Sequence, residues 1–574
     1  MENEVLKLSM GDWVWNAGLT GFINILGEEN VKLSGNMVEV PASCFEAFEE
    51  KYFKYFIDTY EKLLPWYRIV SYKETIERYR EAGFGTLTLK GLQAVNVYIK
   101  DTVKRYLSSN SFKSAFELIG DKEYIEKLEK ELQKIKEPKD EAAFEKELNN
   151  ITDNVKQQFE ILDRIIEYCG SEKGRKFIGA KNVIYSMIKN GWNGVSFLNP
   201  QTKIKDIYED YRTYFVEEAR EYLEAEKSKY KLKCFTCRAP IKDMSNDMSF
   251  INQSGFDTAR KPSHVWDFAN DIALCPVCRL IYSCLPAGFT YVGDRGLYIN
   301  ANIDMKGNLK VNRRVRSDTL NKDDKEYSGR KIYAVLVEAL KEQQLEKGRY
   351  ELADVQLVRY QNERYRFNLL PEMTVKLIDE FSEKISGLSR TGYREGNENN
   401  SIYEQTLEHI FNNQNLFLLI YKLLHYKLAS PRDCYFHMGH ILDMLRLNTR
   451  LIQNLGGMKN MNKDRDYLKE ARGAGFYLRE AYLKKDPRTG KIPGISYRLL
   501  NALKTGNRNM FMDLVLNCYL YVGKEVPGII AEILRDDDEI FSTIGYGFVS
   551  GFIEGERDSK NSNGKTDNRE EIKV

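Results

Sequence analysis

The chain carries two Cys-x-x-Cys knuckles, Lys233-Cys234-Phe235-Thr236-Cys237 and Leu274-Cys275-Pro276-Val277-Cys278, which are separated by residues 238–274. Each knuckle can present two thiolates to one metal ion, and two knuckles complete the four-sulfur tetrahedron of a structural zinc site. We therefore predict a structural Zn²⁺ bound by Cys234, Cys237, Cys275 and Cys278. Four thiolates leave no coordination position open for catalysis. Two alternatives stay open at this point: an iron–sulfur cluster, and two unrelated pairs of reduced thiols.

The segment between the knuckles is longer than in a compact zinc ribbon, so a small subdomain is expected to fold there. It contains His264, which we expect not to be a ligand because four thiolates already complete the site. The remaining cysteines stand singly in apolar surroundings and are predicted to be small buried hydrophobic residues: Cys44, Cys169, Cys284, Cys434 and Cys518.

Length and composition indicate several domains and no global affinity for nucleic acid. The chain has 574 residues, 42% of them hydrophobic and 30% charged, which is enough to build more than one core. Its formal net charge is only +2, so any basic surface must be local. No basic, apolar leader opens the sequence, and the most apolar segment, residues 416–424, is too short to span a membrane. A cytoplasmic location is therefore expected, without contact to a membrane.

The hydrophobic periodicity predicts an α+β protein that is predominantly α-helical. Residues 1–230 are predicted to be mainly helical, and residues 231–370 to hold the zinc module and a small antiparallel sheet. Residues 371–555 are predicted to form a helical bundle, followed by a disordered tail over 556–574.

The N-terminal part opens with an amphipathic helix over residues 11–26, in which Gly18 and Gly21 indicate close packing against another element. A short hairpin is predicted over residues 31–40, and a pair of charged helices over residues 121–168.

In the middle part, antiparallel strands are predicted in residues 288–304 and 355–369, with a basic edge over residues 309–316 between them. The glycine-rich turn around Trp192 can insert into a groove, although a packed tryptophan is the commoner state of such a turn. Base edges are read by amide and cationic side chains on rigid turns. The candidate nucleic-acid contacts of this part are Asn190, Trp192, Asn193, Arg313, Arg314, Arg316, Gln361 and Asn362.

The C-terminal bundle contains a concentration of positive charge. Residues 438–510 hold 15 Lys and Arg against 6 Asp and Glu, a local surplus of nine. A basic helical surface suits a phosphate backbone, whereas any single cation in it is most often a solvated side chain. The candidate phosphate contacts are Arg446, Arg450, Arg472, Arg479, Lys484, Lys485, Arg488, Arg498 and Arg508.

Sequence signatures of catalysis are missing. The chain has no phosphate-binding lysine loop, no His-Glu-x-x-His, no nucleophile elbow and no dinucleotide fingerprint. His437 and His440, with His425 nearby in sequence, form only a weak candidate for a further metal site. We predict that the protein is not an enzyme.

Three features of the sequence form a pattern when taken together. The first is the opening Gly-Asp-Trp…Asn-Ala-Gly-Leu-x-Gly-Phe over residues 11–22, and the second is the four-cysteine site. The third lies near the end, where Arg-Leu-Leu-Asn-Ala-Leu-Lys-Thr-Gly-Asn over residues 498–507 is followed by Tyr-Val-Gly-Lys-Glu-Val-Pro over residues 521–527. Together they resemble the large subunit of the type I-B CRISPR Cascade surveillance complex (Cas-eight family, b1 branch).

The resemblance implies a non-catalytic subunit that contacts the guide-RNA-containing Cascade subunits and target double-stranded DNA. Such a subunit recognises the protospacer-adjacent motif (PAM), assists opening of the duplex and recruits a separate helicase–nuclease. It also implies a C-terminal domain similar to the Cascade small subunit, which an internal start codon can produce separately; possible starts are Met438, Met444, Met458 and Met461.

Two other functions stay open from the sequence. One is a zinc-stabilised nucleic-acid-processing enzyme with an unrecognised active site, which metal-dependent cleavage by the purified chain would reveal. The other is a protein-interaction scaffold whose basic bundle binds acidic partners.

Overall fold

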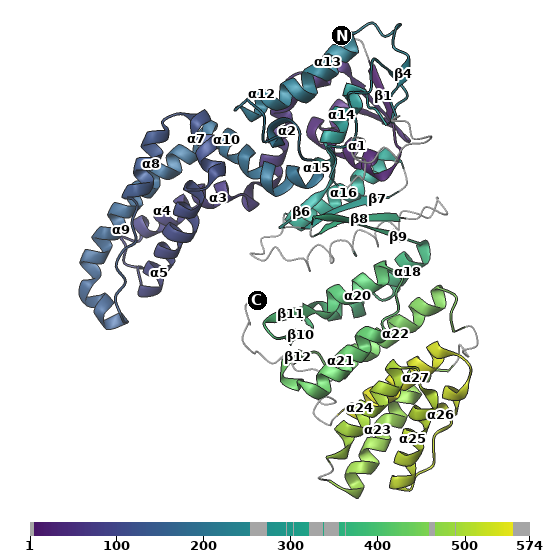
Figure 1. Cartoon of the computed structure of the whole chain (residues 1–574). Coiled ribbons are helices and arrows are strands. Elements are labelled where there is room, and N and C mark those ends of the chain that lie inside the picture. The colour runs from purple at the N-terminus through teal and green to yellow at the C-terminus, as the bar shows by residue number, and fades with distance from the viewer. Residues whose placement is uncertain are drawn as a thin grey trace. The chain divides into compact units, whose positions relative to one another are not determined.

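The computed structural model describes residues 5–252, 272–293, 295–301, 304–320, 337, 355–361, 363–458, 465–487 and 490–554. These residues form a mostly helical α+β fold with small antiparallel sheets and a four-cysteine cluster, which confirms the predicted fold class (Figure 1). His264, the other residues of the central insert from 253 to 271 and the predicted tail lie outside the described residues.

The chain divides into two compact units. Unit 1 takes in the described residues up to 320 together with residues 358–367, and unit 2 takes in residues 355–357 and the described residues from 368 onward. The two knuckles therefore belong to the same unit as the N-terminal helices.

Unit 1 is mainly helical. Its helices are α1 (Trp13–Leu26), α2 (Phe48–Tyr60), α3 (Pro65–Val70), α4 (Lys73–Glu81), α5 (Leu89–Val97), α6 (Arg105–Leu107), α7 (Asn110–Ile119), α8 (Lys122–Glu131), α9 (Glu141–Gly170), α10 (Glu172–Val183), α11 (Lys189–Gly191), α12 (Ile207–Tyr211), α13 (Glu218–Glu224), α14 (Pro276–Ser283), α15 (Leu285–Gly288) and α16 (Met305–Leu320). Its strands are β1 (Val5–Ser9), β2 (Lys32–Ser34), β3 (Met37–Pro41), β4 (Leu232–Lys233), β5 (Pro240–Ile241), β6 (Thr290–Val292) and β7 (Arg295–Asn300), joined by parts of β8 (Val355–Gln361) and β9 (Arg364–Leu370).

Helix α1 packs backbone to backbone against the helices that follow the second knuckle. A Cβ atom placed on Gly21 would lie 2.0 Å from the main-chain oxygen of Cys284, and one on Gly288 would lie 2.2 Å from that of Ala17. A Cβ on Gly18 would likewise lie 2.9 Å from the main-chain oxygen of Ile281. The predicted close packing of α1 is confirmed, and its partners are α14 and α15.

The sequence pattern at the start of α1 is explained by hydrogen bonds. Asp12 caps the helix by accepting from the Trp15 amide at 3.0 Å, and the Trp15 indole donates to the Ser9 carbonyl at 2.8 Å. Asn16 is buried and ties the loop at Gly11 to Asn300 at the end of β7, because its amide donates to both residues. The pattern therefore joins β1, α1 and the central sheet.

The predicted hairpins are confirmed. β1, β3 and β2 form a three-stranded antiparallel sheet, with Leu8 opposite Val38. A four-stranded sheet has the order β6-β7-β8-β9, and its first hairpin pairs Thr290 with Leu297. Helices α8 and α9 lie side by side, as predicted for residues 121–168 (Figure 1).

The basic segment 309–316 is not a sheet edge: it lies inside helix α16. Asn308 and Asn312, one helical turn apart, turn their side chains onto β7 and accept from the amides of Ala301 at 3.1 Å and Ile299 at 2.9 Å. A helix with an asparagine face thus supplies the hydrogen bonds that a neighbouring strand would have supplied. The alternation of basic and apolar residues concealed this helical period.

Unit 2 is a helical bundle, as predicted from residue 371 onward. Its helices are α18 (Glu372–Glu380), α19 (Ser382–Gly387), α20 (Ile402–Phe411), α21 (Phe417–Ala429), α22 (Met438–Asn454), α23 (Tyr467–Lys485), α24 (Lys491–Lys504), α25 (Arg508–Val522), α26 (Gly528–Ala531) and α27 (Asp538–Ile553). A small sheet of β10 (Gly392–Glu395), β11 (Glu398–Ser401) and β12 (Cys434–Tyr435) has the order β11-β10-β12 and was not predicted.

Helices α23 and α27 form the centre of this bundle through a reciprocal pair of glycines. A Cβ on Gly475 would lie 2.0 Å from the Phe548 oxygen, and one on Gly551 would lie 2.1 Å from the Arg472 oxygen. The same device that joins α1 to α15 in unit 1 thus recurs here. Among the described helices of the chain, none is long and apolar enough to cross a membrane.

Candidate metal centre and cationic surfaces

The first knuckle is a tight turn between two short strands. β4 and β5 pair with Lys233 opposite Pro240, and the Cys234 amide donates to the Ala239 carbonyl at 2.8 Å. The turn closes through Arg238, whose φ is +61° and whose amide donates to the Cys234 carbonyl at 3.0 Å. This backbone turns both thiol side chains to the same side.

The second knuckle is the start of helix α14. Cys275 is its N-cap, and its sulfur accepts a hydrogen bond from the Cys278 amide at 3.4 Å. Pro276 occupies the first turn, where its missing N–H costs nothing. The positive end of the helix favours negative charge at this sulfur, which suits a thiolate once a metal ion has displaced its proton.

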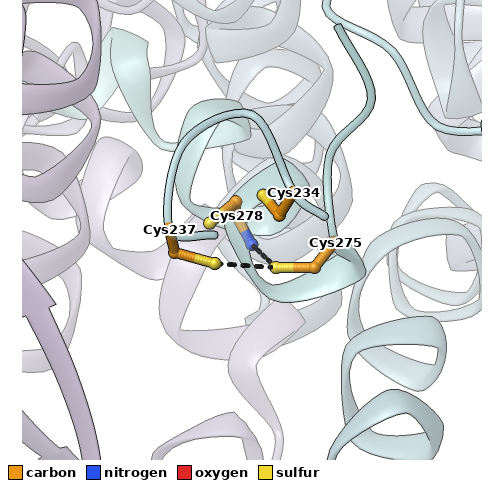
Figure 2. Close-up of side chains that lie close together, drawn as sticks. All are labelled: Cys234, Cys237, Cys275 and Cys278. Atoms are coloured by element: carbon orange, nitrogen blue, oxygen red, sulfur yellow. Dashed lines mark hydrogen bonds between the residues drawn. The ribbon is translucent and has the colours of Figure 1, made fainter. Parts of the chain in front are cut away.

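The four sulfur atoms converge on one point (Figure 2). All lie within 4.8 Å of one another, and the sulfurs of Cys237 and Cys275 are 3.7 Å apart. Tetrahedral coordination with Zn–S bonds of ~2.3 Å requires sulfurs ~3.8 Å apart, so the donor set fits one thiolate-bound ion. Three of the cysteines are buried and Cys237 is exposed. The cluster can therefore bind a metal ion, as predicted.

The proximity of the thiols changes their acidity. Hydrogen bonds from Cys237, Cys275 and Cys278 hold the pKa of the Cys234 thiol far below its usual value. The pKa values of Cys275 and Cys278 are raised, first because their thiols donate to Cys234 and then because they are buried. A bound cation would take the place of the shared protons.

A buried arginine that sequence reasoning missed fixes the knuckles to their surroundings. Arg279 on α14 donates to Glu218 of α13 at 2.8 Å and to the Asn246 side chain at 2.7 Å. Its guanidinium lies 3.9 Å from the ring centre of Tyr214. The only signal in the sequence is an arginine next to the second knuckle, which does not identify these partners.

The comparison with known protein families gives a match over the two knuckles. Residues 227–290 match the family model described as CRISPR-associated protein (Cas_CXXC_CXXC). No curated protein and no solved structure matches the chain. The match indicates a CRISPR-associated protein.

The turn around Trp192 does not present the tryptophan to a nucleic acid. The Trp192 side chain is fully buried and its indole donates to the Ser283 carbonyl at 2.9 Å. Asn190 is half-buried and donates to the Ser186 carbonyl at 3.0 Å, so only Asn193 stands exposed. The role of the tryptophan is to seal α14 against the N-terminal helices.

The three arginines of α16 are engaged within unit 1. Arg313 pairs with Glu28, Arg314 pairs with Asp318 at 2.6 Å, and Arg316 donates to the Tyr55 hydroxyl. Burial lowers the pKa of Arg316 to about 10. Because Arg316 is embedded against Tyr55, it is unsuited to a phosphate contact.

Apart from Arg472, the described cationic candidates of the bundle fall into two groups. Arg446, Arg450 and Arg508 pair with acidic groups: Arg446 with Asp443 at 3.6 Å, Arg450 with Glu380 at 3.2 Å, and Arg508 with Asp536 at 3.2 Å and Asp538 at 2.6 Å. The second group is Lys484, Lys485 and Arg498, which are exposed, and Arg479, which is half-buried. Gln361 ends β8 and is half-buried, while Asn362 and Arg488 lie outside the described residues.

Arg472 neutralises a buried carboxylate. It makes contacts of 2.6 to 2.9 Å with both oxygens of Glu554, which is only 4% exposed. We expect Arg472→Gln to lower the free energy of unfolding by about 3 kcal/mol, because removing one partner leaves the other buried and unpaired. Urea unfolding measures this.

The matched control is Arg446→Gln, which removes a half-exposed cation from the same bundle and should cost less than about 0.5 kcal/mol. The double variant Arg472→Gln with Glu554→Gln should recover most of the loss. A double variant as unstable as Arg472→Gln would show that the pairing is not the cause.

Proposed function

We propose that this chain is the non-catalytic large subunit of a type I-B CRISPR Cascade complex, a cytoplasmic assembly that finds DNA with a guide RNA. The observation that carries the proposal is the family match over the knuckles, which indicates a CRISPR-associated protein. The patterns at residues 11–22 and 498–527 support the finer assignment through their resemblance to that family.

In this role the protein binds target duplex DNA, recognises the PAM, assists strand separation and recruits a helicase–nuclease. It works beside the guide-binding subunits, and a small subunit made from an internal start can accompany it. Base pairing with the guide supplies most of the sequence specificity, so the protein itself needs a short motif reader and backbone contacts. Exposed Asn193, Lys484, Lys485 and Arg498 are the described candidates whose position suits such contacts.

The metal in this proposal is a structural Zn²⁺. Sulfurs within 4.8 Å of one another suit a single ion. Two or four bridged irons would place thiolates on different metal atoms and draw them further apart. The cysteines hold the ion and orient α14, and the ion supplies cross-linking of the two knuckles rather than chemistry.

Duplex binding by the assembled complex tests this function. A duplex with the PAM should bind more tightly than one lacking it by at least ~5-fold, because each wrong base pair costs about 1–3 kcal/mol. Equal affinities would contradict PAM recognition. Metal-dependent cleavage of DNA or RNA by the purified chain alone would contradict a non-catalytic role.

A further inference from the structure

A cavity of about 340 Å³ opens in the bundle of unit 2 between α21, α23, the start of α24 and the end of α27. Five of its seven lining residues are aliphatic, and the other two are cationic, Lys427 and Arg479. None of the residues that line it carries a carboxylate. The cavity therefore presents two cationic side chains and no anionic one.

Both cations are held by main-chain carbonyls. Arg479 donates from Nη1 to the carbonyls of Phe552 at 3.2 Å and Ile553 at 3.4 Å, at the end of α27. Lys427 donates to the Phe436 carbonyl at 3.0 Å. Carbonyl oxygens fix the direction of these side chains but do not cancel a full positive charge.

The guanidinium of Arg479 also keeps one unused donor. Its Nε is buried and finds no acceptor among the described residues. Burial lowers the pKa of Arg479, with only a partial offset from the neighbouring Glu480. A buried donor on an uncompensated cation is costly unless an unseen partner satisfies it.

Two carboxylates directly follow lining residues, and neither forms an ion pair with Arg479 among the described residues. Glu480 only partly offsets the effect of burial on the pKa of Arg479. Glu554, which follows Ile553, binds Arg472 with both of its oxygens. Arg479 thus differs from Arg446, Arg450, Arg472 and Arg508, which all have acidic partners. The partner missing from this site is an anion.

The surroundings of the cavity favour a polyanion. Lys484 and Lys485 follow the lining residue Leu483 and are exposed, and Lys491 precedes the lining residue Ile492. Lys485 and Lys491 stand 4.3 and 4.9 Å from the ring centre of Tyr521. Exposed Lys484 and Lys485 therefore add positive charge beside the cavity, although Asp486 follows them, and a row of phosphates requires such charge.

We infer that this cavity binds one phosphate group of a nucleic-acid backbone through Arg479 and Lys427, an assignment that rests on the proposed function. A guanidinium can meet two phosphate oxygens at once, and the ammonium adds a point charge beside it. The contact positions the strand and carries no sequence information.

Salt-dependent binding of a labelled single-stranded DNA to the full-length protein tests the inference. The double variant Arg479→Gln with Lys427→Gln should lower the slope of log K against log salt by about 0.7, the value for one phosphate contact on a single strand. The single variant Arg479→Lys, which retains Lys427, should show a smaller decrease of the slope than the double variant. The control Arg535→Gln removes a cation of the same unit that pairs with Glu532 at 2.5 Å, and should leave the slope unchanged.

A second measurement separates a nucleic acid from a free phosphate compound. Inorganic phosphate should raise the thermal unfolding midpoint of the wild type above that in chloride of equal ionic strength, and should not do so for the double variant. If the double variant keeps the wild-type slope for DNA, the inference that a nucleic acid occupies the cavity is wrong. If that variant has also lost the stabilisation by phosphate, the cavity binds a free phosphate compound instead. Circular dichroism monitors folding; if Arg479→Gln does not fold, Lys427→Gln alone decides on the same criterion.

The outcome is distinguishable from a failure of the proposed function. A reduced slope in the cavity variant, together with equal binding of duplexes with and without a PAM, would retain the phosphate site and reject PAM recognition. Normal discrimination between the two duplexes, together with an unchanged slope, would retain PAM recognition and reject the phosphate site.

Discussion

Cys275→Ser is expected to abolish metal binding and to unfold the region around the two knuckles. Apparent binding free energies of structural zinc are about 10–16 kcal/mol in zinc-finger peptides, and this energy contributes to folding when the site does not exist in the unfolded chain. Cys275 has two functions, since it is both a ligand candidate and the N-cap of α14. Its loss therefore removes a sulfur and weakens the helix that packs on α1.

The measurement is metal content by mass spectrometry together with thermal unfolding. The wild type should carry one Zn²⁺ per chain, and Cys275→Ser should carry none and melt at a lower temperature. The control is Cys434→Ser, which changes a half-buried cysteine of unit 2 outside the cluster and should keep both metal and stability. A Cys275→Ser protein that remains folded and binds DNA normally would refute a structural role. If the purified wild type instead contains iron and absorbs visible light, the cysteines hold an iron–sulfur cluster and not zinc.

The metal cluster could be predicted because its information is local. Two cysteines two residues apart must lie close together, and the spacing of the two knuckles suggests a common ion. The hairpin at residues 290–300 and the close approach of α1 were likewise visible from short-range patterns of alternation and glycine. Which elements α1 approaches could not be predicted, since Gly21 and Cys284 are distant in sequence.

The cationic candidates were harder to predict because their partners lie far away in the chain. Arg472 and Glu554 are 82 residues apart, so the sequence shows a positive charge where the structure has a neutral pair. Trp192 is a related case: its turn could either insert into a groove or pack, and the structure shows the commoner, packed state, with the indole donating to the Ser283 carbonyl in the core. Arg479 is the opposite case, because only the structure shows that it lacks an acidic partner among the described residues.

Gly21→Ala is expected to destabilise unit 1 by at least ~3 kcal/mol, the upper part of the range for overpacking. The added Cβ would lie 2.0 Å from the Cys284 oxygen and 2.8 Å from the Gly288 nitrogen, and both are backbone atoms that cannot rotate away. Alanine is intrinsically better than glycine inside a helix by about 1 kcal/mol, so the clash must exceed this gain before any loss appears. Urea unfolding measures the net effect.

The matched control is Gly170→Ala, at the end of α9 in the same unit. The nearest atom to its new Cβ is a Val70 methyl at 3.5 Å, an ordinary contact, so this variant should be neutral or slightly stabilised. If Gly21→Ala were as stable as Gly170→Ala, α1 would not pack against α15 as described. If it is unstable and also loses zinc, the contact between α1 and α14–α15 supports the second knuckle, and the N-terminal pattern and the cysteines act as one structural device.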